Sequence, residues 1–421
     1  MGEEEIFITT TPALKGRVKQ RYSDFIVEEV LEDGRVCKVQ RYNRTFEERG
    51  ESKPMEVPPH ENKEQLLVDM EKVNMETSAA VAMISRGLNV SKNRIGYAGL
   101  KDKRAITCQR VSIFSPDPAR VQRFGVKGIE LRNPEWSDKR IELGELKGNN
   151  FVITIRDISA GEEEIRKILE EFGKQAEKGL PNFFGNQRFG GKRQITHRVG
   201  RLLMKGDFQG AVMLYLTETY AEEKEDLKQA RINLAKTGDV RKALREFTFE
   251  ARSEKSILNH LVREPNDYAG AFGVLPKKIR YLFVHSYQSH LFNKMLAERI
   301  RLFGQKALAP IEGDVLENGE PMALLAGFES SFAEGKAGEI EKKALEGEDV
   351  KLEDFRIRKM SELSSKGSRK SIVLRPENFK VVAVGKDEFN EGKSFAAVSF
   401  FLSKGNYATT VLRELLKEDI F

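Results

Sequence analysis

Residues 96–109 carry the residue types that most readily do chemistry. Their sequence is Gly-Tyr-Ala-Gly-Leu-Lys-Asp-Lys-Arg-Ala-Ile-Thr-Cys-Gln, and Asp102 is its single carboxylate. The neighbours Lys101, Lys103 and Arg104 are cations, which favour the ionised form of a carboxyl group. The stretch therefore predicts a nucleophilic or basic carboxylate, although most charge clusters of this kind are solvated turns without a function.

The segments on either side of this stretch would position the carboxylate. Residues 63–87 predict a helix, because Leu66, Met70 and Val73 recur at helical spacing. Residues 110–114, Arg-Val-Ser-Ile-Phe, predict a short strand. The carboxylate is thus expected on a loop between ordered elements, where proteins commonly display reactive groups.

The rest of the chain alternates between segments of strand and helix pattern. A Gly-Asn-Asn turn at 148–150 is expected to lead into a strand that begins at Phe151. Further strands are expected from Phe25 and over 381–384 and 396–402. Helices are expected over 161–178, 278–303 and 408–417, and charged helices over 200–260. Residues 43–62 are expected to form a connection, and residues 305–370 small strands with one charged helix. Strands near both ends and helices between them predict a discontinuous sheet domain with an insertion.

Composition limits the class of protein. The chain has 421 residues, with 71 Lys and Arg against 65 Asp and Glu, which gives a net charge of +6 and a mild preference for a polyanionic partner. Cys37 and Cys108 are the only cysteines, so no disulfide framework is expected. The acidic N-terminus is followed by no long apolar run. We therefore expect a cytoplasmic protein without a membrane span.

Residues 179–191 combine aromatic rings, amides and arginine, which is unusual for a plain connection. Phe184, Gln187 and Arg188 could stack on and hydrogen-bond RNA, and Lys192 and Arg193 could meet its phosphates. The alternative is an aromatic junction between domains. The glycine pair before Lys192 lacks the spacing and the Ser or Thr of a P-loop, so a nucleoside triphosphate site is not expected.

Taken together, these stretches resemble the TruD family of tRNA pseudouridine synthases over most of the chain. Six ordered motifs carry the resemblance, where any one alone would be weak. They are Lys19 with 23–28 (SDFIVE), 97–103 (YAGLKDK), 147–151 (KGNNF), 181–190 (PNFFGNQRFG), 287–289 (YQS) with 291–293 (LFN), and 404–409 (KGNYAT) with 412–414 (LRE). The frequent Pro-Glu pair of the family is replaced here by Tyr22-Ser23.

The resemblance implies an α+β architecture, namely a pseudouridine synthase fold with a mainly antiparallel mixed sheet and an inserted α/β TRUD domain. It places the catalytic domain at 1–180 and 356–421 and the insertion at 181–355. It implies conversion of uridine to pseudouridine in tRNA, typically at position 13, by an archaeal-type enzyme that needs no cofactor. It implies no protein partner.

The resemblance also implies roles for four residues. Asp102 matches the catalytic aspartate of the family, Lys19 its active-site lysine, Phe151 the aromatic ring that packs on the target base, and Asn149 an active-site asparagine. From the residues alone, Phe151 is more often a core side chain and Asn149 a turn former. Their alternative roles are a ring for base stacking and an amide that orients a neighbour.

Two other classes of protein could share some of these features. A noncatalytic RNA-binding protein or RNA chaperone on the same fold would explain the basic charge and the aromatic loops, but it would leave Lys19, Asp102, Asn149 and Phe151 together by coincidence. A metal-dependent nuclease would need clustered carboxylates or histidines, and none has ligand spacing in the sequence.

Overall fold

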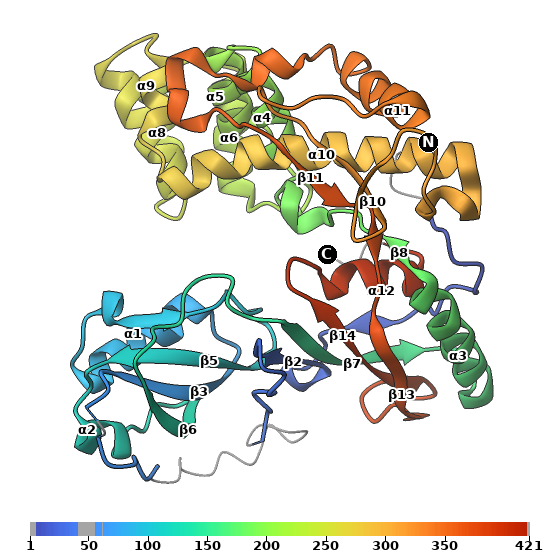
Figure 1. Ribbon diagram of the computed structural model, residues 1–421. Coiled ribbons are helices and arrows are strands. Elements are labelled where there is room, and N and C mark those ends of the chain that lie inside the picture. The colour runs from blue at the N-terminus through green and yellow to red at the C-terminus, as the bar shows by residue number, and fades with distance from the viewer. Residues whose placement is uncertain (1–5, 41–54, 61, 419–421) are drawn as a thin grey trace. The chain divides into compact units, whose positions relative to one another are not determined.

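The computed structural model describes residues 6–40, 55–60 and 62–418, which form two compact units (Figure 1). The sheet unit is built from the described residues of Thr9–Gly179 and from Arg375–Lys417, and the helical unit from Leu180–Leu374 with residues 6–8 and 418. The helical unit is therefore an insertion in the sequence of the sheet unit. The connection expected over 43–62 lies largely outside the described residues.

The insertion extends beyond the expected limit of residue 355. Strand β12 (Val373–Leu374) pairs antiparallel with β8 (Leu180–Pro181), so the segments that enter and leave the helical unit are hydrogen-bonded to each other. This pairing holds residues up to Leu374 with the insertion.

The sheet unit contains a nine-stranded sheet in the order β13-β14-β7-β2-β5-β3-β6, with β1 paired to β7 and β4 to β5. The strands are β1 (Arg17–Val18), β2 (Phe25–Val30), β3 (Gln65–Val73), β4 (Ile95–Tyr97), β5 (Ile106–Phe114), β6 (Ile129–Ser137), β7 (Gly148–Ile158), β13 (Glu377–Lys386) and β14 (Ser394–Ser403). The pairing of β2 with β5 is parallel, and the other ladders of this sheet are antiparallel. The expected mainly antiparallel mixed sheet is confirmed.

Helices cover the two ends of this sheet. The helices of the sheet unit are α1 (Thr77–Leu88), α2 (Pro118–Gln122), α3 (Glu162–Lys178) and α12 (Ala408–Leu416). Helix α1 buries Ala80 and Ile84 against apolar side chains of β3 and β5 such as Val68 and Val111. Helix α3 packs on β13, where the rings of Phe172 and Phe379 meet edge to face with centroids 5.5 Å apart. The strands between these two ends carry the candidate site.

The expected helix over 63–87 is wrong in its first half. Residues 65–73 form strand β3, which lies between β5 and β6, and only the second half, from Thr77, is helical. Leu66, Val68 and Met70 alternate along one face, a period-two pattern that competes with the helical spacing. The opposite face carries charged groups that are paired inside the protein, for example Asp69 with Arg110 at 2.9 Å.

Two strands begin earlier than expected. Strand β5 starts at Ile106 rather than Arg110. The Gly-Asn-Asn sequence at 148–150 belongs to strand β7 rather than to a turn, because it pairs with β2 on one side and with β14 on the other. Ladders on both sides outweigh the local turn preference of glycine and asparagine. The helices expected over 161–178, 278–303 and 408–417 and the strand from Phe25 are confirmed.

The helical unit is organised around its longest helix, α10 (Lys277–Phe303), whose buried face includes Tyr287, Leu291 and Met295. Its other helices are α4 (Thr196–Met204), α5 (Phe208–Thr217), α6 (Glu225–Thr237), α7 (Val240–Glu246), α8 (Arg252–Arg263), α9 (Tyr268–Gly273) and α11 (Gly335–Glu346), and its strands β9 (Val315–Glu317), β10 (Glu320–Leu325) and β11 (Ser368–Ser371) form a small antiparallel sheet. The expected charged helices and small strands are present (Figure 1).

Candidate active site

Lys19 and Asp102, which are 83 positions apart in the chain, form an ion pair. The Lys19 Nζ lies 3.1 Å from the Asp102 Oδ1. The lysine side chain is 7% exposed and the aspartate side chain 37% exposed, so a buried ammonium holds a carboxylate that solvent can reach. The ammonium also lies 3.9 Å from the centroid of the Phe25 ring, which restricts it further.

The backbone at Lys19 is strained. Its φ is 58°, in the left-handed region, where a residue with a Cβ atom costs about 1–2 kcal/mol. Such strain persists only where surrounding contacts over-determine it, and it gathers at functional sites. Here the burial of Lys19 and its pairing with Asp102 supply those contacts.

The backbone of the loop between β4 and β5 is held on both sides of Leu100. The Gln109 amide donates from Nε2 to the Gly99 carbonyl oxygen at 2.9 Å. The Thr77 Oγ1 accepts from the Lys101 amide at 3.0 Å and donates to the Gln109 Oε1 at 3.2 Å. Two side chains from ordered elements thus fix the residues that precede Asp102.

Lys72 fixes Asp102 itself, and the sequence pattern did not identify it. The fully buried Lys72 Nζ donates to the carbonyl oxygens of Asp102 and Met75 at 2.9 and 2.7 Å. Burial lowers the pKa of Lys72 to about 8, while the Asp102 charge opposes that shift. The sequence could have identified Lys72, because it lies in the alternating run 65–73 and a lysine buried in a strand needs hydrogen-bond acceptors nearby.

The cations next to Asp102 in the sequence do not pair with it. Lys101 pairs with Glu29 at 2.5 Å, and both side chains are buried. Burial raises the pKa of Glu29, and the charge of Lys101 opposes this effect. Lys103 lies 3.8 Å from Glu76 in an exposed pair. The expectation that sequence neighbours stabilise the carboxylate is therefore wrong for Lys101 and Lys103, and Lys19 takes that place.

Sheet register puts the anchoring side chains on one face. Lys72 on β3 lies opposite Thr107 on β5, which in turn lies opposite Val27 on β2. Because side chains alternate along a strand, Lys72, Thr107, Gln109 and Glu29 share the face to which the loop is tied.

Asn149 and Phe151 belong to the same face, since they pair with Glu29 and Val27 of β2. The Phe151 ring is 5% exposed, stacks on Phe400 with centroids 5.5 Å apart, and meets Phe25 edge to face at 6.2 Å. Phe25 therefore links Phe151 to Lys19. The buried Asn149 Oδ1 has no hydrogen-bond partner in the described part of the chain, so this acceptor is left unused inside the protein.

The expected RNA-binding residues lie at the start of the helical unit. The Phe184 ring is half-buried, with the Arg188 guanidinium 5.5 Å and the Lys370 ammonium 5.3 Å from its centroid. Gln187 is exposed. Arg188 donates from Nε to the Ser289 Oγ at 3.0 Å.

The two basic residues after this segment have partners inside the protein. The exposed Lys192 pairs with Glu222. Arg193 donates to the carbonyl oxygens of Glu218 and Tyr215 at 3.2 and 2.5 Å, and burial lowers its pKa. An RNA phosphate at Arg193 would have to replace these acceptors.

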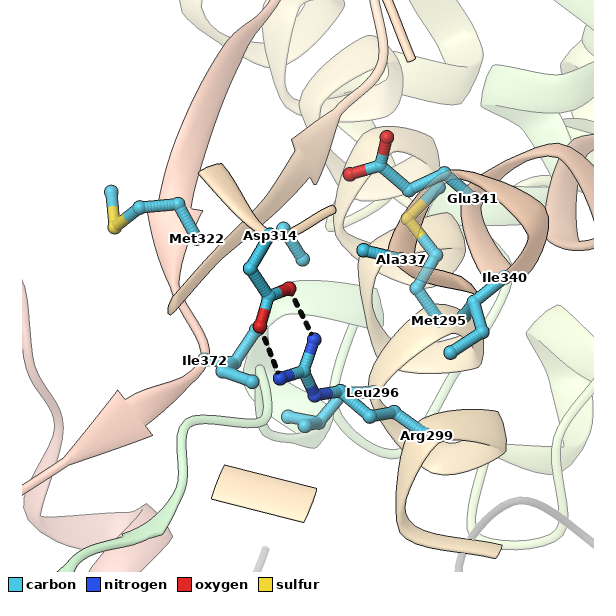
Figure 2. Close-up of a pocket in the computed structure, with 10 residues that line it drawn as sticks. Met295, Leu296, Arg299, Asp314, Met322, Ala337, Ile340, Glu341 and Ile372 are labelled. Atoms are coloured by element: carbon cyan, nitrogen blue, oxygen red, sulfur yellow. Dashed lines mark hydrogen bonds and ion pairs between the residues drawn. The ribbon is translucent and has the colours of Figure 1, made fainter. Parts of the chain in front are cut away.

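A small cavity lies in the helical unit. It measures about 20 Å³, which is room for about one water molecule. Figure 2 shows that Arg299 and Asp314 face each other across it in a two-pronged ion pair, with N to O distances of 2.5 and 2.6 Å. Because these charges satisfy each other in a space of this size, the cavity is not a substrate site.

Comparisons with known proteins show the family of this chain. Residues 2–322 and 317–415 match the model of tRNA pseudouridine synthase D (TruD). The chain belongs to the TruD family. Membership of this family makes the protein an isomerase that acts on tRNA.

Similar chains cover most of the length of this TruD-family protein. A probable tRNA pseudouridine synthase D from Methanosarcina acetivorans is 38% identical over 98% of this chain and 95% of its own. One from Methanopyrus kandleri is 40% identical over 82% of this chain and 84% of its own. The crystal structure of a Methanosarcina mazei protein that bears the name TruD has a TM-score of 0.80 at 36% identity and covers 99% of this chain and 97% of its own.

Two further observations bear on the kind of site. In the described part of the chain, no cluster of three or more histidine, cysteine, aspartate or glutamate side chains could hold a metal ion. Among the same residues, no helix is long and apolar enough to cross a bilayer.

Proposed function

We propose that this TruD-family protein converts uridine 13 of tRNA to pseudouridine, with Asp102 as the catalytic carboxylate. The observation that carries the proposal is the pairing of Asp102 with Lys19 at 3.1 Å, because it leaves a solvent-accessible carboxylate in a fixed position. The same pairing supports the proposed role of Lys19, which is to hold the carboxylate in place.

The reaction needs little beyond such a group. The bond between ribose C1′ and uracil N1 breaks, the base turns, and a bond from C5 to C1′ forms. N1 gains a proton and C5 loses one, so the isomerisation balances without a cofactor. A carboxylate at the target nucleotide serves as nucleophile or base in these steps.

Phe151 and Asn149 are proposed to hold the uracil while it is detached. Both side chains share the sheet face of the Asp102 loop, where the Phe151 ring packs against Phe400, so a base would contact only the edge of the ring that Phe400 and Phe25 leave uncovered. The Asn149 Oδ1 is an acceptor without a partner among the described residues, and it suits an N–H of the base. A base held in this way recombines with the ribose rather than leaving the site.

The helical unit is proposed to contribute RNA contacts. Phe184, Gln187 and Arg188 supply a ring, an exposed amide and a guanidinium from one short segment. Lys192 and Arg193 follow in the sequence and add positive charge. Aromatic and arginine side chains together bind RNA bases by stacking, and the charges meet phosphates.

The test compares the wild-type protein with Asp102→Asn on a tRNA transcript labelled with tritium at uracil C5, because formation of pseudouridine releases that hydrogen. Carbodiimide treatment and reverse transcription then locate the modified position. We expect release and modification at position 13 with the wild type, and a fall of about 1,000-fold or more with Asp102→Asn at unchanged tRNA affinity.

Asp117→Asn is the matched control, because Asp117 is an exposed helix cap in the same unit. It is expected to retain full activity. If the wild type binds tRNA and releases no tritium from any position, the noncatalytic RNA-binding protein becomes the better account. Full activity of a folded Asp102→Asn variant would remove the assignment of Asp102.

A further inference from the structure

The loop that carries Asp102 also carries one of the most exposed leucines of the protein. Leu100 is 72% exposed and lies two positions before Asp102. Leu143 is 75% exposed, and the amide of its neighbour Gly144 donates to the Ala98 carbonyl oxygen at 2.8 Å. Two exposed leucines therefore lie on segments that this hydrogen bond joins, and Leu100 is the one that is two positions from the candidate carboxylate. Single exposed leucines are common, so exposure alone assigns no role.

The backbone on both sides of Leu100 is fixed. Gly99 is held through its carbonyl oxygen by Gln109, and Lys101 is held through its amide by Thr77. The Lys101 side chain is also anchored, in its pair with Glu29. Leu100 is thus presented to solvent on a rigid backbone, and little conformational entropy is lost when a partner covers it.

The partner implied by the proposed function is a nucleotide stack in folded RNA. A uridine whose glycosidic bond must reach a carboxylate has to leave its stack, and this unstacking is costly. The vacated space is apolar and bounded by base faces. Proteins that distort nucleic acids fill such spaces with leucine, isoleucine, methionine or phenylalanine.

We propose that Leu100 is a wedge that enters the base stack of the tRNA when the target uridine is turned out towards Asp102. The proposal rests on the proposed function. It assigns Leu100 a positioning role in base extrusion, separate from the bond-making steps.

The experiment measures single-turnover pseudouridine formation by Leu100→Ala and Leu100→Met on two tRNA transcripts. The first is the intact tRNA, and the second carries an abasic residue next to the target uridine, so that extrusion breaks less stacking. Leu302→Ala is the matched control, because Leu302 is 59% exposed at the end of α10 in the helical unit.

We expect Leu100→Ala to lower the rate tenfold or more on the intact tRNA and less than twofold on the abasic tRNA. Leu100→Met, which keeps an apolar side chain of similar size, and Leu302→Ala should both retain the wild-type rate on each substrate. A 2-aminopurine beside the target should show a smaller fluorescence rise with Leu100→Ala than with the wild type, because less of the stack opens.

An equal loss on both tRNAs would overturn the wedge, since the side chain would then serve loop geometry or chemistry. An unchanged rate on the intact tRNA would also overturn it. Failure of the proposed function is distinguishable, because the wild type would then form pseudouridine on neither substrate.

Discussion

Replacement of Lys72 by methionine distinguishes the contribution of Lys72 to the position of Asp102 from its contribution to the stability of the fold. The change keeps a long unbranched side chain and removes the ammonium that donates to the Asp102 and Met75 carbonyl oxygens. It leaves the Lys19 to Asp102 ion pair untouched. The variant therefore tests whether the loop that carries Asp102 must be anchored by Lys72.

The expected effect on stability is small because two contributions oppose each other. A hydrogen bond from a charged donor contributes about 1.5–3 kcal/mol, so the two bonds contribute about 3–6 kcal/mol. Burial lowers the pKa of Lys72 from 10.5 to about 8, which at about 1.36 kcal/mol per pKa unit corresponds to a cost of about 3 kcal/mol for the buried charge. The net loss on replacement is about 0–3 kcal/mol.

The expected effect on activity is larger. Release of the Asp102 carbonyl oxygen lets the carboxylate move, and a misplacement of about 1 Å costs about 100-fold in rate. We therefore expect single-turnover tritium release to fall about 100-fold at unchanged tRNA affinity. Far-UV circular dichroism and a urea melt on the same samples measure the fold and its stability.

Lys103→Met is the matched control, because it removes the same charge near Asp102, from the loop that carries it, at a side chain that is 64% exposed. It should retain the rate within about threefold, since exposed pairs contribute little. A folded Lys72→Met variant with wild-type activity would refute the reasoning. An equal loss in Lys103→Met would also refute it, because the effect would then come from charge alone.

The helical unit allows two further predictions. Arg188→Met should weaken tRNA binding, measured by filter binding. It should also reduce the slope of log affinity against log salt by about 0.7–0.9 for each phosphate that the variant no longer neutralises. The control Arg198→Met, which replaces an exposed arginine paired with Glu218, should change neither quantity. Lys370→Met should stabilise the protein at pH 7 by up to about 3 kcal/mol in urea melts, because burial lowers the pKa of Lys370 from 10.5 to about 8 and the described residues offer it no ion pair. Between pH 8 and 10.5, Lys370 is protonated in the unfolded chain and neutral in the folded one, so wild-type stability should rise with pH relative to the variant. A difference in stability that stays constant over this pH range would contradict this reasoning.

Local patterns in the sequence were sufficient to predict the amphipathic helices. The helix over 161–178 and the long helix from 277 to 303 have apolar residues at helical spacing, and both form as expected. The loop position of Asp102 also followed from the sequence, because glycines and charges interrupt two regular segments. The order of six short motifs indicated the family, which the comparisons confirm.

The tertiary structure decided which charges meet. Sequence proximity suggested Lys101 as a partner of Asp102, but the Lys101 side chain is buried in the sheet unit, where Glu29 receives it. Lys19 reaches Asp102 only because the chain segment before β2 lies against the loop after β4. Such pairings depend on sheet order, since the parallel register of β2 and β5 joins segments about 80 residues apart.

The sequence by itself therefore determined which residue types could do the chemistry and which segments could be helical. Those properties depend on neighbours within a few positions. The structure alone decided that residues 65–73 form a central strand and that Lys72 ends beneath Asp102, because burial between two ladders depends on residues far away in the chain.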